Sequence, residues 1–377
     1  MKNIILLGAT GSIGTQVLDE IKNNQDKYNL IAFSFNKNVE KANKIIDEFQ
    51  PLMVATANKD AVKFIKSRTE LGVFTDIKNI IIKQENTILV NAISGYEGIV
   101  YSYDALNKGI DLYLANKESL VAAGDILIEL AKKRNAKIVP IDSEHTALMD
   151  LKTINKEEKI VKYYITASGG SFRDLSLDEL KYVKKEDALK HPTWKMGPKI
   201  TIDSATMMNK VFEIVEAAKL YSLSLDDIDV LIDRKSNVHA CLEFANGKIM
   251  AHVSNNDMHL PIKFAISDFE KSYNLDLNKY SKEELFSKYH LDYISKERYP
   301  ALKFAEYILT NKSFSGIIIT TINDLLVNKF LNDEISFCDI TDKLFYYYDL
   351  WKDEFNNLPY NIENILFVKD IIERRFD

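Results

Sequence analysis

Two carboxylates two residues apart, Asp142 and Glu144, are the first candidates for chemistry in this sequence. They follow AKIVP, an apolar run typical of a buried strand, and open parallel sheets bind their ligands at the carboxyl ends of strands. In an extended segment side chains i and i+2 point the same way, so both carboxylates can reach one cation. Glu213, in the helical pattern MMNKVFEIVEA, is a third candidate ligand, although acidic pairs are also common on ordinary surfaces. Oxygen ligands without cysteine favour Mg²⁺ or Mn²⁺ over zinc.

A candidate phosphate site follows a second strand-like run. Ser168 precedes two glycines in YYITASGG, and Ser204 lies where we expect a helix to begin. Hydroxyls and unpaired backbone N–H groups at such positions bind phosphate well. Asn209 and Lys210 follow one turn later, which predicts that they lie near the same ligand.

The segment HPTWKMGPK, residues 191–199, is predicted to be a loop, because prolines and a glycine interrupt any helix or strand. His191 and Trp194 would let this loop close over a small substrate and exclude water. We therefore expect the loop to be mobile without ligand. The alternative is that Trp194 anchors the loop in the core.

A glycine-rich turn, GATGSIG, joins the first strand-like run to a helical pattern. Glycines at such a turn let the backbone approach a pyrophosphate, and the following helix N-terminus supplies N–H groups and a positive dipole. Because strand, glycines and helix all match this context, the turn predicts a dinucleotide site.

The end of the second strand-like run indicates which dinucleotide binds. An NAD site usually has an acidic residue about 20 residues past the glycines, whereas this chain has Asn36, Lys37 and Asn38. A lysine flanked by amides suits a 2′-phosphate, so NADPH is favoured over NADH. Taken alone, Lys37 is better explained as a solvated loop lysine.

The elements that position these residues fall into three parts. Through the first 140 residues, strand-like runs alternate with helical patterns: NIILLG, NLIAFSF, LMVAT, TILVNAIS, DLYLA and AKIVP. This alternation predicts an α/β fold with a doubly wound, Rossmann-like sheet.

The following region is predicted to be mixed α+β, with SATMMNKVFEIVEAAKL as one helix, and the C-terminal part of the chain is predicted to be helical. The expected domains are 1–142 for NADPH binding, 143–267 for catalysis, 268–293 as a linker with one helix, and 294–377 as a helical domain.

Composition excludes several classes of protein. The chain has 377 residues, 46% of them hydrophobic, and a net charge of −6, with 49 basic and 55 acidic residues. A net charge this small, with acidic and basic residues interspersed, predicts no basic surface that would bind nucleic acid. The apolar runs are shorter than a membrane-spanning helix needs. MKNIILLGATG does not resemble a signal peptide. Cys241 and Cys338 are far apart in the sequence and are expected to be reduced. We therefore expect a cytoplasmic protein, and the charge and the short apolar runs predict that it binds neither nucleic acid nor membrane.

Together the motifs carry a family resemblance. GATGSIG, LANKESLV, DSEHTA, SGGSF, HPTWKMGPKIT and DSATMMNK, in this order and spacing, resemble the 1-deoxy-D-xylulose 5-phosphate reductoisomerase family over nearly the whole chain. The resemblance implies isomerisation and NADPH-dependent reduction of 1-deoxy-D-xylulose 5-phosphate, a phosphorylated ketose, to 2-C-methyl-D-erythritol 4-phosphate in isoprenoid precursor synthesis. It also implies dependence on Mg²⁺ or Mn²⁺, and a V-shaped homodimer with three domains like those above, joined through the central one.

The resemblance also implies a role for each matching residue. The metal ligands are Asp142, Glu144 and Glu213. The cofactor residues are Gly8, Thr10, Gly11, Ser12, Ile13, Asn36, Lys37, Asn38, Asn116, Glu118 and Gly197. The substrate residues are Lys117, Ser143, Glu144, Ser168, His191, Trp194, Met196, Ser204, Asn209, Lys210 and Glu213. Among them Lys117, Glu144, Lys210 and Glu213 are the expected catalytic residues.

Some positions depart from the family pattern. The family usually has His-Pro-Gln-Ser where this chain has Asp233 to Ser236, and glycine is common where it has Val211; ISGYEG, around Gly95, diverges too.

Two other classes of function stay open at this point. One is an NADP-dependent dehydrogenase of the homoserine or semialdehyde type, which needs no carboxylate triad. The other is a non-catalytic NADPH-binding relative, against which the intact carboxylates and Lys210 argue.

Overall fold

The computed structural model of the chain describes residues 1–66, 70–194, 196–267, 278–310 and 314–376. It divides into two compact units. Unit 1 comprises Met1–Ser119, Asp125–Asp142 and Met258–Glu270, and unit 2 comprises Leu120–Gly124, Ser143–Asp257 and Lys271–Asp377. Residues 268–277 of the expected linker and Lys195 of the expected loop lie outside the described residues.

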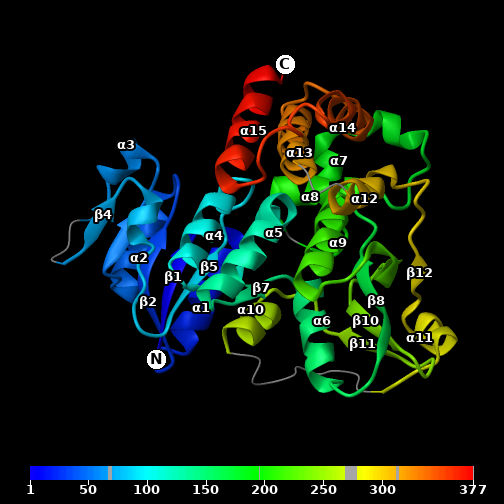
Figure 1. Ribbon diagram of the computed structural model, residues 1–377, viewed down its shortest axis with the longest axis horizontal. Helices are drawn as coiled ribbons and strands as arrows, with labels where there is room; N and C mark the ends of the chain where they lie inside the picture. Colours follow the sequence, from blue (N-terminus) through cyan, green and yellow to red (C-terminus); the bar gives the residue numbers. More distant parts are fainter. Residues whose placement is uncertain (67–69, 195, 268–277, 311–313, 377) are drawn as a thin grey trace. The chain divides into compact units, whose positions relative to one another are not determined.

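Unit 1 is built on a seven-stranded sheet in the order β4-β3-β2-β1-β5-β6-β7, drawn in blue to cyan in Figure 1. The strands are β1 (Lys2–Leu7), β2 (Tyr28–Ser34), β3 (Met53–Ala55), β4 (Gly72–Phe74), β5 (Thr87–Asn91), β6 (Asp111–Leu114) and β7 (Ile138–Pro140). All pairs are parallel, and β1 pairs with both β2 and β5. Because the strand order reverses between β1 and β5, the ligand crevice of such a sheet lies beyond their carboxyl ends. The predicted α/β class is confirmed.

The edge strand β4 was not predicted from the sequence. It has three residues, none of them buried, so it lacks the apolar run that revealed its neighbours. Its pairing with β3 is therefore a tertiary effect.

The helices of unit 1 connect consecutive strands, and one arrives from far along the chain. They are α1 (Ser12–Asn23), α2 (Val39–Phe49), α3 (Lys59–Val62), the 3₁₀ helix η1 (Ile77–Ile80), α4 (Gly98–Asn107), α5 (Lys117–Arg134) and α10 (His259–Ile266). Helix α10 packs beside α1, as Figure 1 also shows, and Ile262 and Ile266 join the core that contains Ile4 and Leu6. Lys2 Nζ donates to Ile266 O at 2.7 Å.

Helix α5 changes unit along its length. Leu120–Gly124 cluster with unit 2, and Ala123, at φ −131° and ψ 16°, interrupts the helical geometry there. The residues before this kink include Lys117, so the start of α5 belongs to unit 1.

Unit 2 contains a mixed five-stranded sheet in the order β11-β10-β8-β9-β12. The strands are β8 (Ile160–Ala167), β9 (Ile228–Ile232), β10 (Val238–Phe244), β11 (Ile249–Val253) and β12 (Asp292–Tyr293). Strands β8 and β9 are parallel and the other pairs are antiparallel. Helix α6 (Ser143–Ile154) packs on β10 and β11.

The single helix expected over SATMMNKVFEIVEAAKL is wrong. Helix α8 (Pro198–Thr206) ends at Met207, and α9 (Met208–Tyr221) begins after it. Met207 has φ +68° and a buried side chain. Neither glycine nor proline marks this break, so burial rather than local propensity places it.

The remaining helices of unit 2 include the C-terminal helical part, in orange and red in Figure 1. They are η2 (Glu179–Tyr182), α7 (Lys185–Ala188), η3 (Leu225–Asp227), α11 (Lys282–Tyr289), η4 (Pro300–Leu302), α12 (Lys303–Thr310), α13 (Ser315–Leu331), α14 (Phe337–Trp351) and α15 (Ile362–Arg375). Helix α13 contacts α8, α12, α14 and α15 and is buried on nearly every side. A helix buried all round is a core helix in a large unit. Within the described ranges, every helix is too short or too polar to cross a lipid bilayer.

Candidate active site

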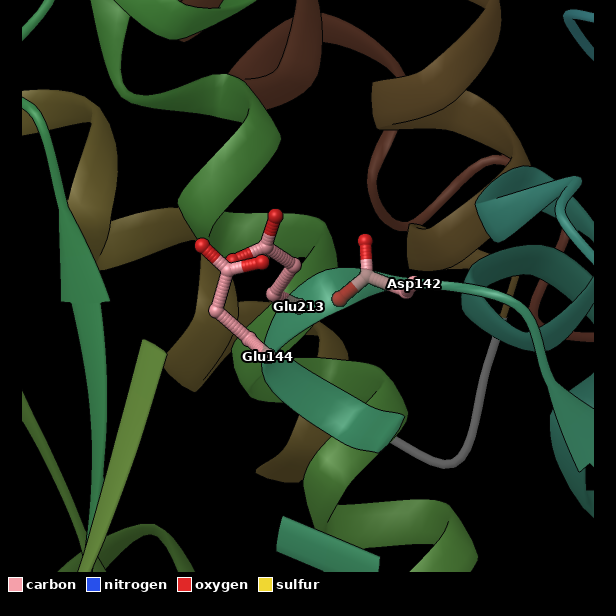
Figure 2. A group of neighbouring side chains, drawn as sticks. All are labelled: Asp142, Glu144 and Glu213. Carbon is pink, nitrogen blue, oxygen red and sulfur yellow. The ribbon is translucent and has the colours of Figure 1, made fainter. Parts of the chain in front are cut away.

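Three carboxylates meet at the start of α6 (Figure 2). Each of Asp142, Glu144 and Glu213 offers one oxygen, and these oxygens lie within 4.8 Å of one another. Asp142 follows β7, Glu144 lies in the first turn of α6, and Glu213 comes from α9. The expectation of an extended segment is wrong, because α6 already begins at Ser143; the helical turn and α9 together bring the carboxylates to one place.

Two lysines partly neutralise these carboxylates. Lys117 Nζ donates to Asp142 Oδ2, and Lys210 Nζ donates to Glu213 Oε2, to Glu144 Oε1 at 3.2 Å and to Thr166 O. Lys210 and Glu213 are 3% and 1% exposed, where an uncompensated charge is costly. Three carboxylates against two ammonium groups leave one formal negative charge.

The donor set suits a hard divalent cation. Oxygen ligands are what Mg²⁺ and Mn²⁺ prefer, and three like charges this close need positive charge among them. Two more side chains complete the cluster: Ser143 Oγ donates to Glu144 Oε2, and Asn209 Nδ2 donates to Glu213 Oε1 at 2.6 Å. Both side chains hold a carboxylate in place.

Two serines and a histidine form a separate polar group in unit 2. His191 Nε2 lies 3.0 Å from Ser168 Oγ and 3.2 Å from Ser204 Oγ. His191 Nδ1 accepts from the backbone N–H groups of Thr193 and Trp194 at 3.3 and 2.9 Å. Because Nδ1 accepts, the proton of the neutral ring sits on Nε2 and faces the serines.

Ser204 is not at the start of a helix, as the sequence suggested, but near the end of α8. Ser204 nevertheless lies beside His191 and Ser168, because the turn at residues 168–170 packs against the end of α8. A Cβ on Gly170 would lie 2.6 Å from Ala205 Cα, so the two segments are in backbone contact.

Burial, with the nearby positive charge of Arg173, lowers the pKa of His191 from 6.5 to about 4. The imidazole is therefore neutral at pH 7 and presents a single N–H donor. Arg173 Nη1 donates to Ser168 O at 2.8 Å, so a cation stands behind the serine turn. Hydroxyls, an N–H donor and a nearby cation make an anion subsite.

The predicted loop at 191–199 ends earlier than expected, because α8 begins at Pro198. The part before α8 contacts the turn at 233–236, which departs from the family pattern. Thr193 Oγ1 lies 2.9 Å from Ser236 Oγ, and the Trp194 ring lies 6.3 Å from that of His239. Asp233 closes the turn by accepting from the backbone N–H groups of Lys235, Asn237 and Val238 at 2.7–2.9 Å. Trp194 is half-buried. Its lid and anchor roles both remain predictions.

The glycine-rich turn in unit 1 has the geometry expected of a pyrophosphate site. Gly8 has φ +78°, and a Cβ there would lie 2.6 Å from Ala92 O, so only glycine fits. Its N–H donates to Ser34 Oγ at 3.1 Å, and α1 begins at Ser12 with Gly11 as N-cap. Gly11 N donates to Gly8 O at 3.0 Å within the turn, and the residues from Thr10 to Ile13 are at least partly exposed, so the N–H groups of Thr10, Ser12 and Ile13 can meet a ligand.

The end of β2 carries the residues expected to select NADPH. Asn36, Lys37 and Asn38 are exposed, and Asn38 caps α2 by accepting from Lys41 N at 2.9 Å. The sequence reasoning missed Lys41, whose Nζ donates to Thr10 O at 3.1 Å and to Thr15 Oγ1. Its spacing, one turn into the helix that follows Lys37, was the signal that would have revealed it.

Comparisons with known proteins place this geometry in a family. Models described as 1-deoxy-D-xylulose 5-phosphate reductoisomerase, its C-terminal domain, and DXP reductoisomerase C-terminal domain match residues 4–124, 138–221 and 253–374. Reductoisomerases of that name from Listeria innocua and Macrococcus caseolyticus are 39% and 40% identical over 344 residues, 90% of each chain. The chain belongs to the 1-deoxy-D-xylulose 5-phosphate reductoisomerase family.

Solved structures of this family share the whole fold. A DOX-P reductoisomerase in complex with NADPH, fosmidomycin and magnesium is 30% identical with a TM-score of 0.85, and covers 99% of this chain and 97% of its own. The enzyme from Zymomonas mobilis in complex with NADPH is 28% identical with a TM-score of 0.82, covering 98% and 96%. The predicted family and the predicted class of enzyme, an NADP-dependent oxidoreductase, are confirmed.

Two of the predicted cofactor residues, Asn116 and Glu118, are buried and form hydrogen bonds with the backbone of the protein itself. Asn116 caps α5 and donates to Ile93 O and Gly95 O at 2.9 and 2.7 Å, while Glu118 accepts from Gly95 N at 3.1 Å. They hold the chain that follows β5, at the ligand edge of the sheet. Direct contact with the cofactor stays a prediction for both.

The remaining predicted residues lie at the start of α8. Gly197 is the exposed N-cap of that helix, and Met196 before it is half-buried. Their contacts with cofactor and substrate also stay predictions.

Proposed function

We propose that this reductoisomerase rearranges 1-deoxy-D-xylulose 5-phosphate and reduces the product with NADPH to 2-C-methyl-D-erythritol 4-phosphate, using Mg²⁺ or Mn²⁺. Family membership confirms the predicted reaction and cofactors. The observation that carries the proposal is the carboxylate triad of Asp142, Glu144 and Glu213, two of them buried and Glu144 partly exposed, in a chain that also has a dinucleotide-type turn. A simple dehydrogenase needs no such triad.

In our proposal separate groups of side chains bind the phosphate, the hydroxyketone and the carbon chain of the substrate. Ser168, Ser204 and the Nε2–H of His191 bind the phosphate, because they converge within hydrogen-bonding distance. Asp142, Glu144 and Glu213 would hold the cation, which when bound supplies Lewis acidity to a hydroxyketone. Trp194 and Met196 cover the carbon chain and exclude water.

The two lysines stabilise the charge that develops during the rearrangement. As the carbon chain breaks and re-forms, negative charge accumulates on the substrate oxygens. Lys117 and Lys210 are cations held by the carboxylates that surround those oxygens. Preorganised donors of this kind lower the barrier because they need no reorientation.

The proposal extends to the cofactor, the domains and the assembly. The turn from Gly8 to Ile13 binds the pyrophosphate, and Lys37 with its flanking amides reads the 2′-phosphate. Residues 1–142 bind NADPH, 143–267 carry catalysis and dimer contacts, 268–293 link, and 294–377 form the helical domain. We propose a cytoplasmic homodimer, which the family resemblance and two free cysteines support.

An NADPH oxidation assay with purified 1-deoxy-D-xylulose 5-phosphate tests the reaction. We expect absorbance loss at 340 nm that depends on the substrate and on added Mg²⁺ or Mn²⁺, with the branched polyol phosphate as product. Sedimentation of the same sample tests the homodimer. Oxidation that is unchanged after chelation, or a product with an unbranched carbon chain, would contradict the proposal.

A further inference from the structure

A cavity of about 430 Å³ lies within unit 2, behind the serine turn. It is lined by Phe172, by Ala205 and Thr206 at the end of α8, by residues 297–300 and by the start of α14. No residue assigned above to substrate, cofactor or metal lines it. Its volume is that of a small-molecule site.

The floor of the cavity is apolar and aromatic. Phe172, Tyr299 and Phe337 are each less than a tenth exposed, and the rings of Phe172 and Phe337 pack edge to face at 4.9 Å. A flat aromatic ligand gains most from such a floor, since ring contacts contribute beyond the buried area.

One cation at the cavity has hydrogen-bonding capacity to spare. Arg298 Nη2 donates to Phe172 O at 2.5 Å, but Arg298 Nε is buried with no partner, and the guanidinium forms no ion pair within the described part of the chain. The other charged lining residues, Lys181, Glu297 and Asp342, are exposed and screened by water. A guanidinium that lines the cavity with one carbonyl acceptor and, among the described residues, no ion pair keeps its positive charge available to an anionic ligand.

The cavity walls are the same segments that hold the phosphate-binding hydroxyls. Tyr299 Oη donates to Gly169 O at 2.9 Å, and Arg298 Nη2 donates to Phe172 O. Residues 298 and 299 are therefore hydrogen-bonded to the turn that follows Ser168. Ala205, which also lines the cavity, directly follows Ser204. A ligand that moves either wall therefore moves a hydroxyl of the anion subsite.

We propose that this cavity is a regulatory site for a small aromatic carboxylate, which binds Arg298 and the aromatic floor and changes the affinity of the Ser168–His191–Ser204 group for the substrate phosphate. The coupling rests on the proposed function. Binding at the cavity does not.

Cys338 gives a direct test of occupancy. It lines the cavity, whereas Cys241 is fully buried. Ellman's reagent supplies the probe: the Cys338 thiolate attacks its disulfide, forms a mixed disulfide and expels one thionitrobenzoate, leaving an aromatic carboxylate tethered in the cavity. Burial, with Asp342 and Asp339 nearby, raises the pKa of this thiol, so labelling is run at pH 8.5. We expect one equivalent released by the native protein and none by Cys338→Ser.

The labelled enzyme should show an altered KM for the ketose phosphate, by about threefold or more, since the phosphate group is disturbed. Cys338→Ser treated with the same reagent, and native enzyme capped with the small neutral iodoacetamide, should keep the original KM. Free 2-naphthoate should slow labelling and shift the KM for the ketose phosphate in the same direction as the tethered label does. Arg298→Lys, which keeps the charge but lacks the planar, forked donors that bind a carboxylate through two hydrogen bonds, should weaken that protection.

The outcomes separate the two claims. Labelling unaffected by 2-naphthoate, or equally protected in Arg298→Lys, overturns the carboxylate site. Protection with an unchanged KM overturns the coupling. Protection in a protein that never turns over the ketose phosphate leaves the cavity site standing and contradicts the proposed function instead.

Discussion

The contact between the Ser168 turn and α8 makes Gly170→Ala a sharp test of the anion subsite. Gly170 has φ +74°, and an added Cβ would lie 2.6 Å from Ala205 Cα and 2.8 Å from Ser204 O. Both obstacles are backbone atoms, so no side chain can rotate away. Gly247→Ala is the matched control, because Gly247 has φ +76° and nothing within 4 Å of its added Cβ.

The control isolates backbone strain from the steric clash. A non-glycine residue in the left-handed region costs about 1–3 kcal/mol, and both variants bear this cost. Overpacking adds about 1–3 kcal/mol for Gly170→Ala alone. At about 2–4 °C per kcal/mol for a unit of this size, we expect Gly170→Ala to melt several degrees below Gly247→Ala.

The clash should lower activity as well as stability. Relieving the clash requires the turn to move by about 1 Å relative to Ser204, and a misplacement of that size costs about 10²-fold in rate. Since His191 Nε2 lies 3.0 and 3.2 Å from the two hydroxyls, such a shift breaks at least one contact.

Thermal melts and NADPH oxidation at varied substrate measure both effects on the same samples. We expect Gly170→Ala to raise KM and lower kcat/KM, and Gly247→Ala to leave both near the native values. If the two variants melt together and share one KM, the Ser168 turn does not depend on its contact with α8, and the reasoning is refuted.

Three further predictions concern metal, cofactor and pH. Glu213→Gln should fold, because Lys210 keeps Glu144 and Thr166 O as partners, yet lower kcat/KM by about 100-fold, or 2.7 kcal/mol; unchanged NADPH oxidation at limiting metal would remove Glu213 from the ligand set. Lys37→Ala should raise the KM for NADPH about tenfold, about 1.4 kcal/mol, and leave that for NADH unchanged, whereas equal losses would show that Lys37 does not read the 2′-phosphate. Because the pKa of His191 falls from 6.5 to about 4 on folding, the unfolded chain binds more protons between these pH values, and stability is lost as pH falls through that window; denaturant melts of His191→Gln should show a flatter dependence there, and parallel profiles would count against a neutral His191.

The parts of this protein that sequence predicted well are those with local signals. Position 8 requires glycine, because its φ is positive and Ala92 lies too close for a side chain. Six of the seven parallel strands of unit 1 were predicted because each is an apolar run in the sequence. The carboxylates of Asp142, Glu144 and Glu213 were predicted to gather, and the structure brings them together. Their roles as ligands remain to be tested.

The errors share a physical cause. Strand β4 has no buried residue of its own, and the break at Met207 has no glycine or proline to announce it. Both depend on partners distant in sequence, which local patterns do not contain. The helical start at Ser143 was missed for a related reason, since an acidic stretch after a strand is compatible with either a loop or the first turn of a helix.

The pairing of the buried Lys210 with two carboxylates of the triad ties the fold to the chemistry. Lys210 is 3% exposed, and a buried ammonium without partners would be strongly destabilising, so Glu144 and Glu213 are needed to hold it even before any cation binds. The same two carboxylates are the proposed metal ligands. Removing either carboxylate therefore withdraws a metal ligand and a partner of Lys210 together, and the two losses are coupled rather than additive. It follows that Lys210→Met combined with Glu213→Gln should destabilise less than the sum of the single changes, because the double variant removes both members of the Lys210–Glu213 ion pair together and each single change removes only one.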